Sequence, residues 1–394
     1  MEDLRERLRL LPCGRRLLDA VADSPGVHLV GGAVRDLLLG REPRELDVVV
    51  EGDVDAIALR LGARSATHAR FGTLTVEGAD GCRYDLAMAR AETYAHPGAL
   101  PDVAPAAIDD DLRRRDVTVN ALALDLRSGE LRAVAHAHED LAAGRLRVLH
   151  DASFADDPTR LWRIARYRAR LGFDLEEHTA QLAAAAVAGG ALGTVSATRI
   201  GNELRLALGE PDPAAALESA AALGLAPWLR VDRERAAAAL ALLPAGEGAR
   251  ELVTLAAWLA PGAGAEVAAL GFDARESALL RAADRAPRLA AAMTAAARPS
   301  ALARVLRGLP VEAVALAGAH GAPEPARRWL DDLRHVALAI GGDDLLAAGI
   351  PAGPSIGARL AAALDRRLDG ELAAGRDAEL AAALALPDPG AAMT

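Results

Sequence analysis

The stretch HLVGGAVRDLLLGREPRELDVVV, residues 28–50, contains in close succession an apolar run, two glycines, a helix-type segment and a second apolar run. Gly31 and Gly32 follow the predicted strand 27–30 and precede the predicted helix. A helix N-terminus offers free backbone N–H groups and the positive end of a dipole, so this turn is a candidate anion site, with Arg35 one turn further on. A second interpretation stays open, in which the glycines only supply a backbone with positive φ.

Two acidic residues open the second apolar run of this stretch. Glu45 and Asp47 lie two positions apart, so on a strand their side chains share one face. Two neighbouring carboxylates repel each other unless a cation neutralises them, which makes the pair a candidate metal site. Asp85, in the predicted strand 83–89, is the candidate third carboxylate of a two-metal clamp for phosphoryl transfer. The alternative is a solvated strand edge without a ligand.

Around this stretch, the first 150 residues alternate short β-type runs with helical or turn segments, which is an α/β pattern. After about Phe154, Leu and Ala recur at helical spacing between Gly, Pro and Asp breaks, and only helices are predicted there. A chain of 394 residues is too long for one ordinary core, so two or more domains are expected. The predicted strands are 27–30, 46–50, 72–78, 83–89, 121–126 and 132–136.

Composition narrows the class of protein. The formal net charge is −10, so a nucleic-acid or nucleotide partner requires a local basic patch, and every basic residue is arginine, which favours forked contacts to phosphate. Cys13 and Cys82 are the only cysteines, which suggests a reducing compartment and argues against both a disulfide framework and a cysteine zinc site. The N-terminus lacks an apolar signal core and no apolar run reaches membrane-spanning length, so a soluble cytoplasmic protein without a membrane partner is expected.

A charged segment, DDDLRRRDVTVNALAL at 109–124, precedes another predicted strand. Arg115, Asp116 and Asn120 lie close together in it and are candidates for binding a triphosphate and ribose hydroxyls. A charged helix start whose Asp and Arg side chains pair with each other explains the same residues equally well.

A second basic segment, FADDPTRLWRIARYRARLGF at 154–173, has the features of a helix start. Asp157 is a suitable N-cap, and proline suits the first helical position that follows. Arg160, Arg163 and Arg166 recur every three residues, so they form a slanting basic band beside the apolar stripe. With Asp157, this band is a candidate for contacting the edge of a base and its phosphates. The alternative is a solvated helix face.

The order of these motifs resembles the class II tRNA nucleotidyltransferases, the bacterial family of CCA-adding enzymes and poly(A) polymerases within the polymerase-beta-like superfamily. The resemblance is carried by LVGGAVRDLLLG, the acid–x–acid pair, FGT, YDLAMARAETYAHPGALP, DLRRRDVTVNALAL and DDPTRLWRIARYRARLGF. It covers about residues 25–175 and returns in GGDDLLAAGIPAGPSIG at 341–357. It implies an α+β protein with a mixed-sheet nucleotidyltransferase head at 1–150, a neck with a nucleotide-selecting element at 151–210, a helical body at 211–330 and an RNA-binding helical tail at 331–394.

The resemblance also implies roles for individual residues. Glu45 and Asp47 occupy the magnesium-ligand positions, and Asp85 stays a candidate third catalytic acid. Asp157 and Arg160 match a protein template that pairs with the edge of cytosine or adenine. The expected contacts to triphosphate, sugar and base are Gly31, Gly32, Arg35, Arg115, Asp116, Asn120, Arg163 and Arg166.

The implied reaction is nucleotidyl transfer to tRNA. The 3′-OH of the RNA attacks the α-phosphate of CTP or ATP, pyrophosphate leaves, and two Mg²⁺ ions activate the hydroxyl and steady the triphosphate. Three positions depart from the family pattern: Glu45 replaces Asp, Asp156 replaces Glu, and AVAHA at 133–137 replaces an Asp-Pro-x-Gly-Gly element. Complete CCA addition is therefore expected, with CC-only, A-only or poly(A) addition, or a catalytically impaired RNA-binding paralogue, as alternatives. The oligomeric state cannot be predicted.

Overall fold

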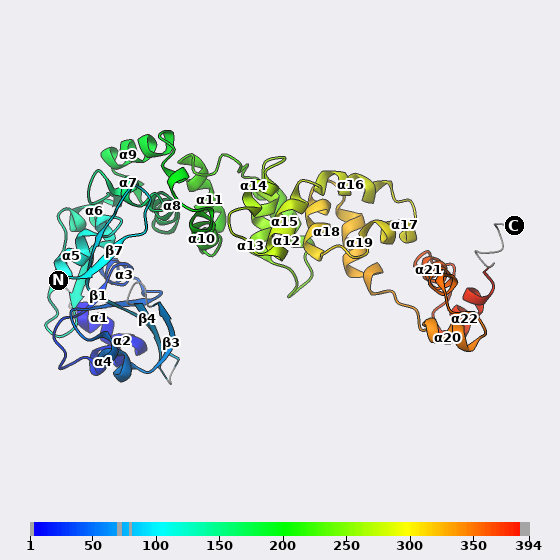
Figure 1. The fold of residues 1–394 in the computed structure, drawn as a ribbon, viewed down its shortest axis with the longest axis horizontal. Coiled ribbons are helices and arrows are strands. Elements are labelled where there is room, and N and C mark those ends of the chain that lie inside the picture. The colour runs from blue at the N-terminus through cyan, green and yellow to red at the C-terminus, as the bar shows by residue number, and fades with distance from the viewer. Residues whose placement is uncertain (1–3, 69–72, 79–80, 387–394) are drawn as a thin grey trace. The chain divides into compact units, whose positions relative to one another are not determined.

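A computed structural model of the chain describes residues 4–68, 73–78 and 81–386, and the chain divides into two compact units, Met1–Pro227 and Trp228–Thr394 (Figure 1). Each unit is described by itself. In the described residues no helix combines the length and the apolar character needed to cross a membrane.

The first unit is built on a mixed seven-stranded sheet with the strand order β3-β4-β5-β2-β1-β8-β9. β2 and β5 are parallel neighbours, whereas the other neighbouring strands of this sheet are antiparallel. This confirms the predicted α+β class with a mixed sheet. The strands are β1 Val27–Val30, β2 Leu46–Val50, β3 Ala63–His68, β4 Thr73–Glu77, β5 Arg83–Met88, β8 Leu122–Asp125 and β9 Leu131–Ala133.

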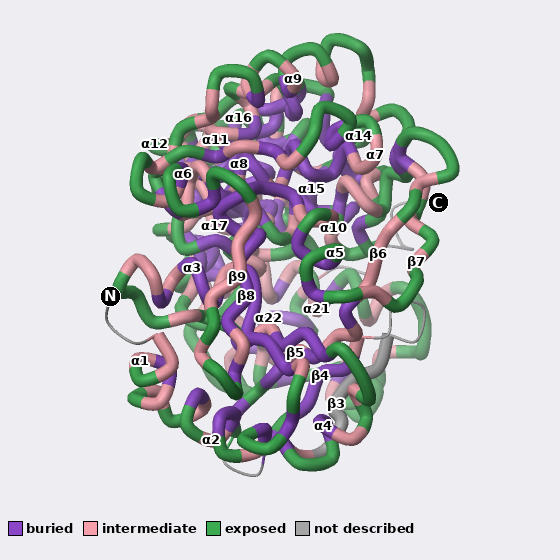
Figure 2. Tube along the Cα trace, turned by 90° about the vertical axis from the view of Figure 1, so that its left-hand side faces the viewer, coloured by how far each residue is buried: buried purple, intermediate pink, exposed green. Residues whose placement is uncertain are grey.

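One face of this sheet forms the main apolar core of the unit. Val48 and Val50 of β2 and Leu86 of β5 point to this face, where four helices cover them. Val49 points to the opposite face and packs with Ile108 of the helix α5. Figure 2 shows buried residues, in purple, along β5 and β8 of this sheet. The covering helices are α1 Leu4–Leu10, α2 Pro12–Ala20, α3 Gly32–Leu38 and α4 Val54–Leu61, and α5 spans Ile108–Arg113.

Most strands lie where the sequence predicts them, and two groups do not. The bounds of β1 and β2 match the predicted runs, and β4, β5, β8 and β9 overlap theirs. Position 72 lies outside the described residues. The sequence misses β3 and the hairpin formed by β6 (Arg90–Thr93) and β7 (Asp102–Pro105). The expectation that strands end near Phe154 is wrong, because β11 (Asp174–Leu175) pairs in parallel with β10 (Arg145–Leu146).

Apart from these strands, the remainder of the first unit is helical, and α8 is its central element. α8 is amphipathic and packs against α10 and α11 through a buried side that includes Leu161, Trp162 and Ile164. The helices after the sheet are α6 Ala137–Ala143, α7 Ser153–Asp156, α8 Arg160–Leu171, α9 Glu177–Ala188, α10 Ala197–Leu208 and α11 Pro213–Ala222.

The second unit is helical, as predicted. Its last three helices enclose a small apolar core around Leu345, Ala363 and Ala383. The predicted division at 150, 210 and 330 stays a prediction. The helices are α12 Arg233–Leu242, α13 Arg250–Trp258, α14 Gly264–Ala268, α15 Ala274–Ala283, α16 Ala286–Ala295, α17 Pro299–Leu306, α18 Val311–Ala319, α19 Pro323–Asp331, α20 Gly342–Ala347, α21 Pro354–Leu368 and α22 Arg376–Leu384.

The two cysteines are joined, contrary to the expectation from their number. Cys13 of α2 and Cys82, the residue before β5, form a disulfide with their Cα atoms 5.4 Å apart. The Tyr84 hydroxyl donates a hydrogen bond to the Cys13 carbonyl at the same place. Helix packing brings together positions that are 69 residues apart, which the spacing of the cysteines does not reveal. The cysteine count therefore no longer supports a reducing compartment.

Candidate active site

Three carboxylates gather on the face of the sheet opposite the main core. Asp47 and Asp85 are register partners in the parallel pair β2–β5, so their side chains leave the sheet side by side. Glu45 precedes β2 and adds a third carboxylate, and one ligand oxygen from each residue lies within 4.8 Å of the others. The structure thus brings together the three acids that the sequence singled out.

The surroundings of this cluster fit a hard cation. Burial, followed by the charges of Glu45 and Asp85, raises the pKa of Asp47 to about 6, although Arg115 and Arg163 oppose the shift. The Thr75 hydroxyl donates to Asp85 Oδ1 over 2.6 Å and fixes the orientation of that carboxylate. Oxygen donors whose charges repel each other are the ligand set that Mg²⁺ accepts. The donor set therefore fits a divalent cation.

A cavity of about 930 Å³ in the first unit opens beside the carboxylates. Its lining is dominated by arginine side chains from the head and from α8 and α10, which suits a polyanionic ligand. Asp85 is not among its lining residues. The predicted site residues that do line it are Gly31, Gly32, Arg35, Glu45, Asp47, Arg115, Asp116, Asn120, Asp157, Arg160, Arg163 and Arg166.

The paired glycines form a tight corner of the cavity against two arginines. Gly31 has φ of +68°, and a Cβ there would lie 2.8 Å from Nη1 of Arg115. The Gly31 N–H donates to the Leu122 carbonyl, so it is not free for the predicted anion site. Arg35 is buried and donates to Oδ1 of Asn120 over 2.5 Å. The positive φ thus favours glycine at position 31, whereas a Cβ there would only displace the end of the Arg115 side chain.

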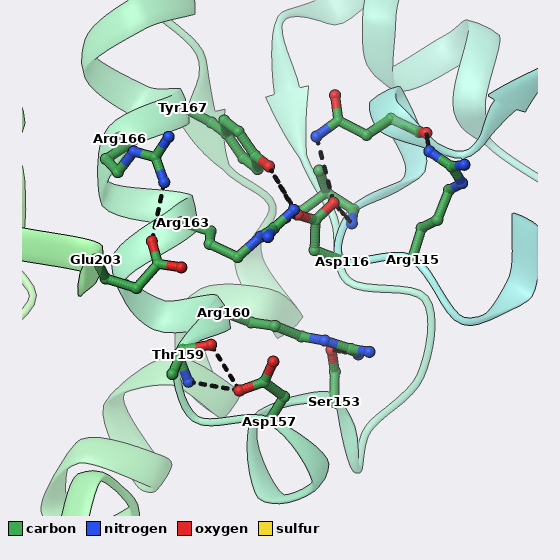
Figure 3. Close-up of polar contacts among 12 residues, drawn as sticks. Arg115, Asp116, Ser153, Asp157, Thr159, Arg160, Arg163, Arg166, Tyr167 and Glu203 are labelled. Atoms are coloured by element: carbon green, nitrogen blue, oxygen red, sulfur yellow. Dashed lines mark hydrogen bonds and ion pairs between the residues drawn. The ribbon is translucent and has the colours of Figure 1, made fainter. Parts of the chain in front are cut away.

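Asp116 lies at the centre of a buried network between the head and α8 (Figure 3). Its Oδ2 accepts from Nε of Arg163 at 2.7 Å and from the Tyr167 hydroxyl at 2.8 Å, and its Oδ1 accepts from Asn120. Burial alone would raise the pKa of Asp116, but Arg163 and Tyr167 hold it far below its usual range. Burial also raises the pKa of Tyr167 to about 12, so the hydroxyl stays a donor. In this structure the predicted ribose ligand Asp116 positions other cavity residues.

Arg160 is the first residue of α8 and Asp157 lies three residues before it. Their side chains form hydrogen bonds with different residues. Asp157 Oδ1 accepts from the backbone N–H of Thr159 at 3.0 Å and from its hydroxyl at 2.6 Å. Arg160 is buried and donates to the Ser153 hydroxyl and to the Arg114 carbonyl. The predicted helix start after Asp157 is wrong by two residues, because α8 begins at Arg160. The predicted N-cap Asp157 is therefore wrong as well, because Thr159 is the N-cap of α8 and Asp157 is the C-cap of α7.

The rest of the arginine band is paired with acids from α10 and the residues after it. Arg166 donates to Glu203 at 2.9 Å and to Glu210 at 3.0 Å, and Arg170 donates to both oxygens of Glu210. Sequence reasoning missed Glu203 and Glu210 as partners, together with Arg199. Arg199 and Glu203 belong to α10 and Glu210 follows it, in a part of the chain that carries no motif, so only tertiary structure identifies them.

The segment 133–137, which replaces the glycine-containing family element, has an unusual backbone. His136 in this segment has φ of +65°. Among the described residues, no other non-glycine residue has a positive φ. Residues other than glycine rarely adopt the left-handed region, and histidine, although commoner there than most, carries a modest strain. Nδ1 of His136 lies 3.1 Å from Glu139, which is exposed at the start of α6.

Comparison with known proteins agrees with this geometry. Residues 27–147 match the poly A polymerase head domain. The chain is 35% identical over 401 residues to the A-adding tRNA nucleotidyltransferase of Geobacter sulfurreducens, covering 92% of this chain and 45% of that protein. It is 41% identical over 216 residues to the CC-adding tRNA nucleotidyltransferase of Deinococcus radiodurans, covering 52% and 57%.

The solved structure of the Thermotoga maritima CCA-adding enzyme complexed with tRNA is also similar. It aligns with a TM-score of 0.72 and 28% identity, covering 98% of each chain. By contrast, the present chain spans about half the length of the curated relatives that it matches.

Proposed function

Because this chain belongs to the tRNA nucleotidyltransferase family that shares the poly A polymerase head domain, we propose that it builds or repairs the 3′-terminal CCA of tRNA from CTP and ATP. The observation that carries this proposal is the cluster of Glu45, Asp47 and Asp85 beside an arginine-lined cavity. Acids that hold a cation next to side chains that bind phosphate are the parts that nucleotidyl transfer requires.

We assign the residues in and beside the cavity three roles: binding the triphosphate, holding the cation and contacting the base. Arg115 and Arg163 lie near enough to Asp47 to lower its pKa, which supports our proposal that they bind the triphosphate beside the carboxylates. Glu45 and Asp47, with Asp85 as a third ligand, would hold Mg²⁺, which when bound would favour ionisation of the RNA 3′-OH and neutralise the triphosphate. Asp157 and Arg160 offer an acceptor and donors for the edge of cytosine or adenine. Because the relatives are tRNA nucleotidyltransferases, we also propose a cytoplasmic location, which the Cys13–Cys82 disulfide does not support.

Addition of only part of the CCA end is the second candidate. Two observations favour it: the relatives named above are A-adding and CC-adding enzymes, and His136 makes the 133–137 segment conformationally strained where the family element carries glycines. Histidine has less backbone freedom than glycine, so this segment would rearrange less readily between successive nucleotides.

The test is incorporation of labelled CTP or ATP, with magnesium, into tRNAs that end before CCA, after CC and after CCA. Addition that stops at a complete CCA supports the first candidate. Addition of only CC or only A supports the second. Measurable tRNA binding without incorporation would contradict both and indicate an impaired paralogue. Asp47→Ala should abolish incorporation, whereas Asp174→Ala, an exposed acid of the same unit, should not.

A further inference from the structure

Arg199 approaches the nucleotide-selecting residue Asp157 from a different helix. It lies in the first turn of α10, where its backbone N–H donates to the capping side chain of Ser196. Its guanidinium makes two contacts: Nη1 donates to the Gly98 carbonyl over 2.8 Å, and Nη2 donates to Oδ1 of Asp157 over 2.8 Å. A planar guanidinium with both ends bonded has little freedom to move.

The Gly98 end of this contact is itself fixed. Gly98, in the segment between β6 and β7, has φ of +73°, and a Cβ there would lie 2.2 Å from the Thr194 hydroxyl oxygen. Its N–H donates to the carbonyl of Ala155, which lies in α7, the helix that ends one residue before Asp157. Arg199 therefore bonds to Asp157 from an anchored position.

The two carboxylate oxygens of Asp157 therefore differ in their hydrogen bonding. Oδ1 accepts three hydrogen bonds, two from Thr159 and one from Arg199. Within the described part of the chain, Oδ2 accepts none, although Asp157 lines the cavity. Figure 3 shows both Thr159 bonds reaching the same oxygen of Asp157, with the second oxygen directed away from Thr159.

We propose that Arg199 is a positioning residue for base selection: it holds Asp157 by Oδ1 so that Oδ2 is presented to the cavity as a fixed acceptor. This inference rests on the proposed function. Cytosine N4 and adenine N6 are amino donors, whereas uracil O4 and guanine O6 are acceptors that a carboxylate oxygen repels. Discrimination requires that Oδ2 cannot turn away from the wrong base, because preorganised groups select better than mobile ones.

The contact predicts a specific effect of substitution. Arg199→Ala leaves Asp157 with its Thr159 bonds alone, so the carboxylate gains freedom without losing its position in the chain. We expect the ratio of CTP to UTP affinity, and of ATP to GTP affinity, to fall roughly tenfold, the effect of about one charge-assisted hydrogen bond. Arg199→Lys should restore most of each ratio, because an ammonium can still donate to Asp157.

The experiment is calorimetric titration of the full-length wild-type protein and its variants with each of the four nucleoside triphosphates. Arg168→Ala is the matched control, since Arg168 lies on α8, pairs with Asp174 and does not line the cavity. Asp157→Ala and the double variant Asp157→Ala/Arg199→Ala complete a double-mutant cycle. If Arg199 acts through Asp157, these last two variants share the same affinity ratios.

The outcomes separate the two proposals. A wild-type preference for CTP and ATP that is lost in Arg199→Ala, kept in Arg168→Ala and not lost further in the double variant supports the role of Arg199. A preference that survives in Arg199→Ala overturns this inference and leaves the proposed function standing. A wild-type protein without any preference among the four nucleotides overturns both.

Discussion

Glu45 stands where the family has Asp, so the acidic cluster includes one carboxylate on a longer side chain. It is exposed and precedes β2, and yet its carboxylate oxygen joins those of Asp47 and Asp85 within 4.8 Å. The departure from the family's Asp therefore does not remove a carboxylate from the cluster. The Glu45 side chain is long enough to bring its carboxylate into the cluster.

Shortening this side chain should impair the site. Asp at position 45 would withdraw the carboxylate by about 1.5 Å, roughly one carbon–carbon bond. A misplacement of about 1 Å can cost around a hundredfold in rate, so we expect Glu45→Asp to lower the rate of nucleotide incorporation by about ten- to a hundredfold. Single-turnover incorporation measured over a range of magnesium concentrations checks this, and a faster Glu45→Asp variant would show that Glu45 hampers the enzyme.

Asp47 illustrates a conflict between function and stability. Its pKa is raised to about 6, so between about pH 4 and 6 the unfolded chain releases this proton while the folded chain retains it. The free energy of unfolding falls with rising pH across that window, and above it the folded protein carries an unfavourable charge. Without a metal ion, the carboxylate therefore destabilises the first unit.

Replacing that charge should stabilise the metal-free protein. We expect Asp47→Asn to abolish incorporation and to raise the free energy of unfolding at pH 7, in chelator, by about 1–3 kcal/mol. Below about pH 4 the gain should disappear, because the wild-type carboxyl is then protonated in both states. Denaturant unfolding at both pH values measures this. An equal gain at both would mean that packing, not charge, is responsible.

The site residues differ in how far sequence could identify them. Glu45, Asp47 and Asp85 are predictable because strand periodicity sets the face of each side chain, although only the parallel pairing of β2 and β5 places Asp85 opposite Asp47. Asp116 is predictable as a site residue but not as the partner of Arg163 and Tyr167. Arg199 gives no local signal, because its role depends on a contact across 42 residues.

Among the elements, those defined by periodicity or glycine are predictable and those defined by pairing are not. β1 and β2 are buried apolar runs, and α3 follows its glycine turn directly. β6 and β7 are polar or short and exist because they pair with each other. The two-residue strands β10 and β11 likewise depend on contact between segments distant in the chain.

The disulfide links two elements whose pairing the cysteine spacing does not predict. It fastens α2 to the start of β5, the strand that carries Asp85, and it closes a sequence separation of 69 residues. Cross-linking a loop of this size removes conformational freedom from the unfolded chain, worth about 2–4 kcal/mol in typical proteins.

Reduction should therefore destabilise the first unit. We expect a reducing agent to lower its free energy of unfolding by about 2–4 kcal/mol, measured by denaturant unfolding under matched conditions. Cys13→Ser should show the same loss and no further response to the reductant. A wild-type protein that unfolds identically with and without reductant would mean that the bond contributes nothing to stability in solution.

At the scale of the whole molecule, the division at Pro227 separates the nucleotide site from the helical second unit. Every residue that lines the large cavity lies in the first unit, and so do the three carboxylates. The net charge of −10 argues against attraction of RNA by the surface as a whole, so the proposed tRNA binding would combine local contacts with shape. The second unit is the candidate for those contacts.

This division makes the two kinds of binding separable. We expect a fragment of residues 1–227 to bind CTP nearly as tightly as the full chain, because every residue that lines the cavity is present in it. The two affinities should agree within about threefold, a difference of less than about 1 kcal/mol. Its affinity for tRNA should fall at least tenfold, measured by filter binding at one fixed salt concentration, because helices that hold the RNA by shape are missing. Asp47→Ala in the full chain is the converse control, with tRNA binding kept and incorporation lost. A fragment that binds tRNA as tightly as the full chain would place the whole RNA site in the first unit.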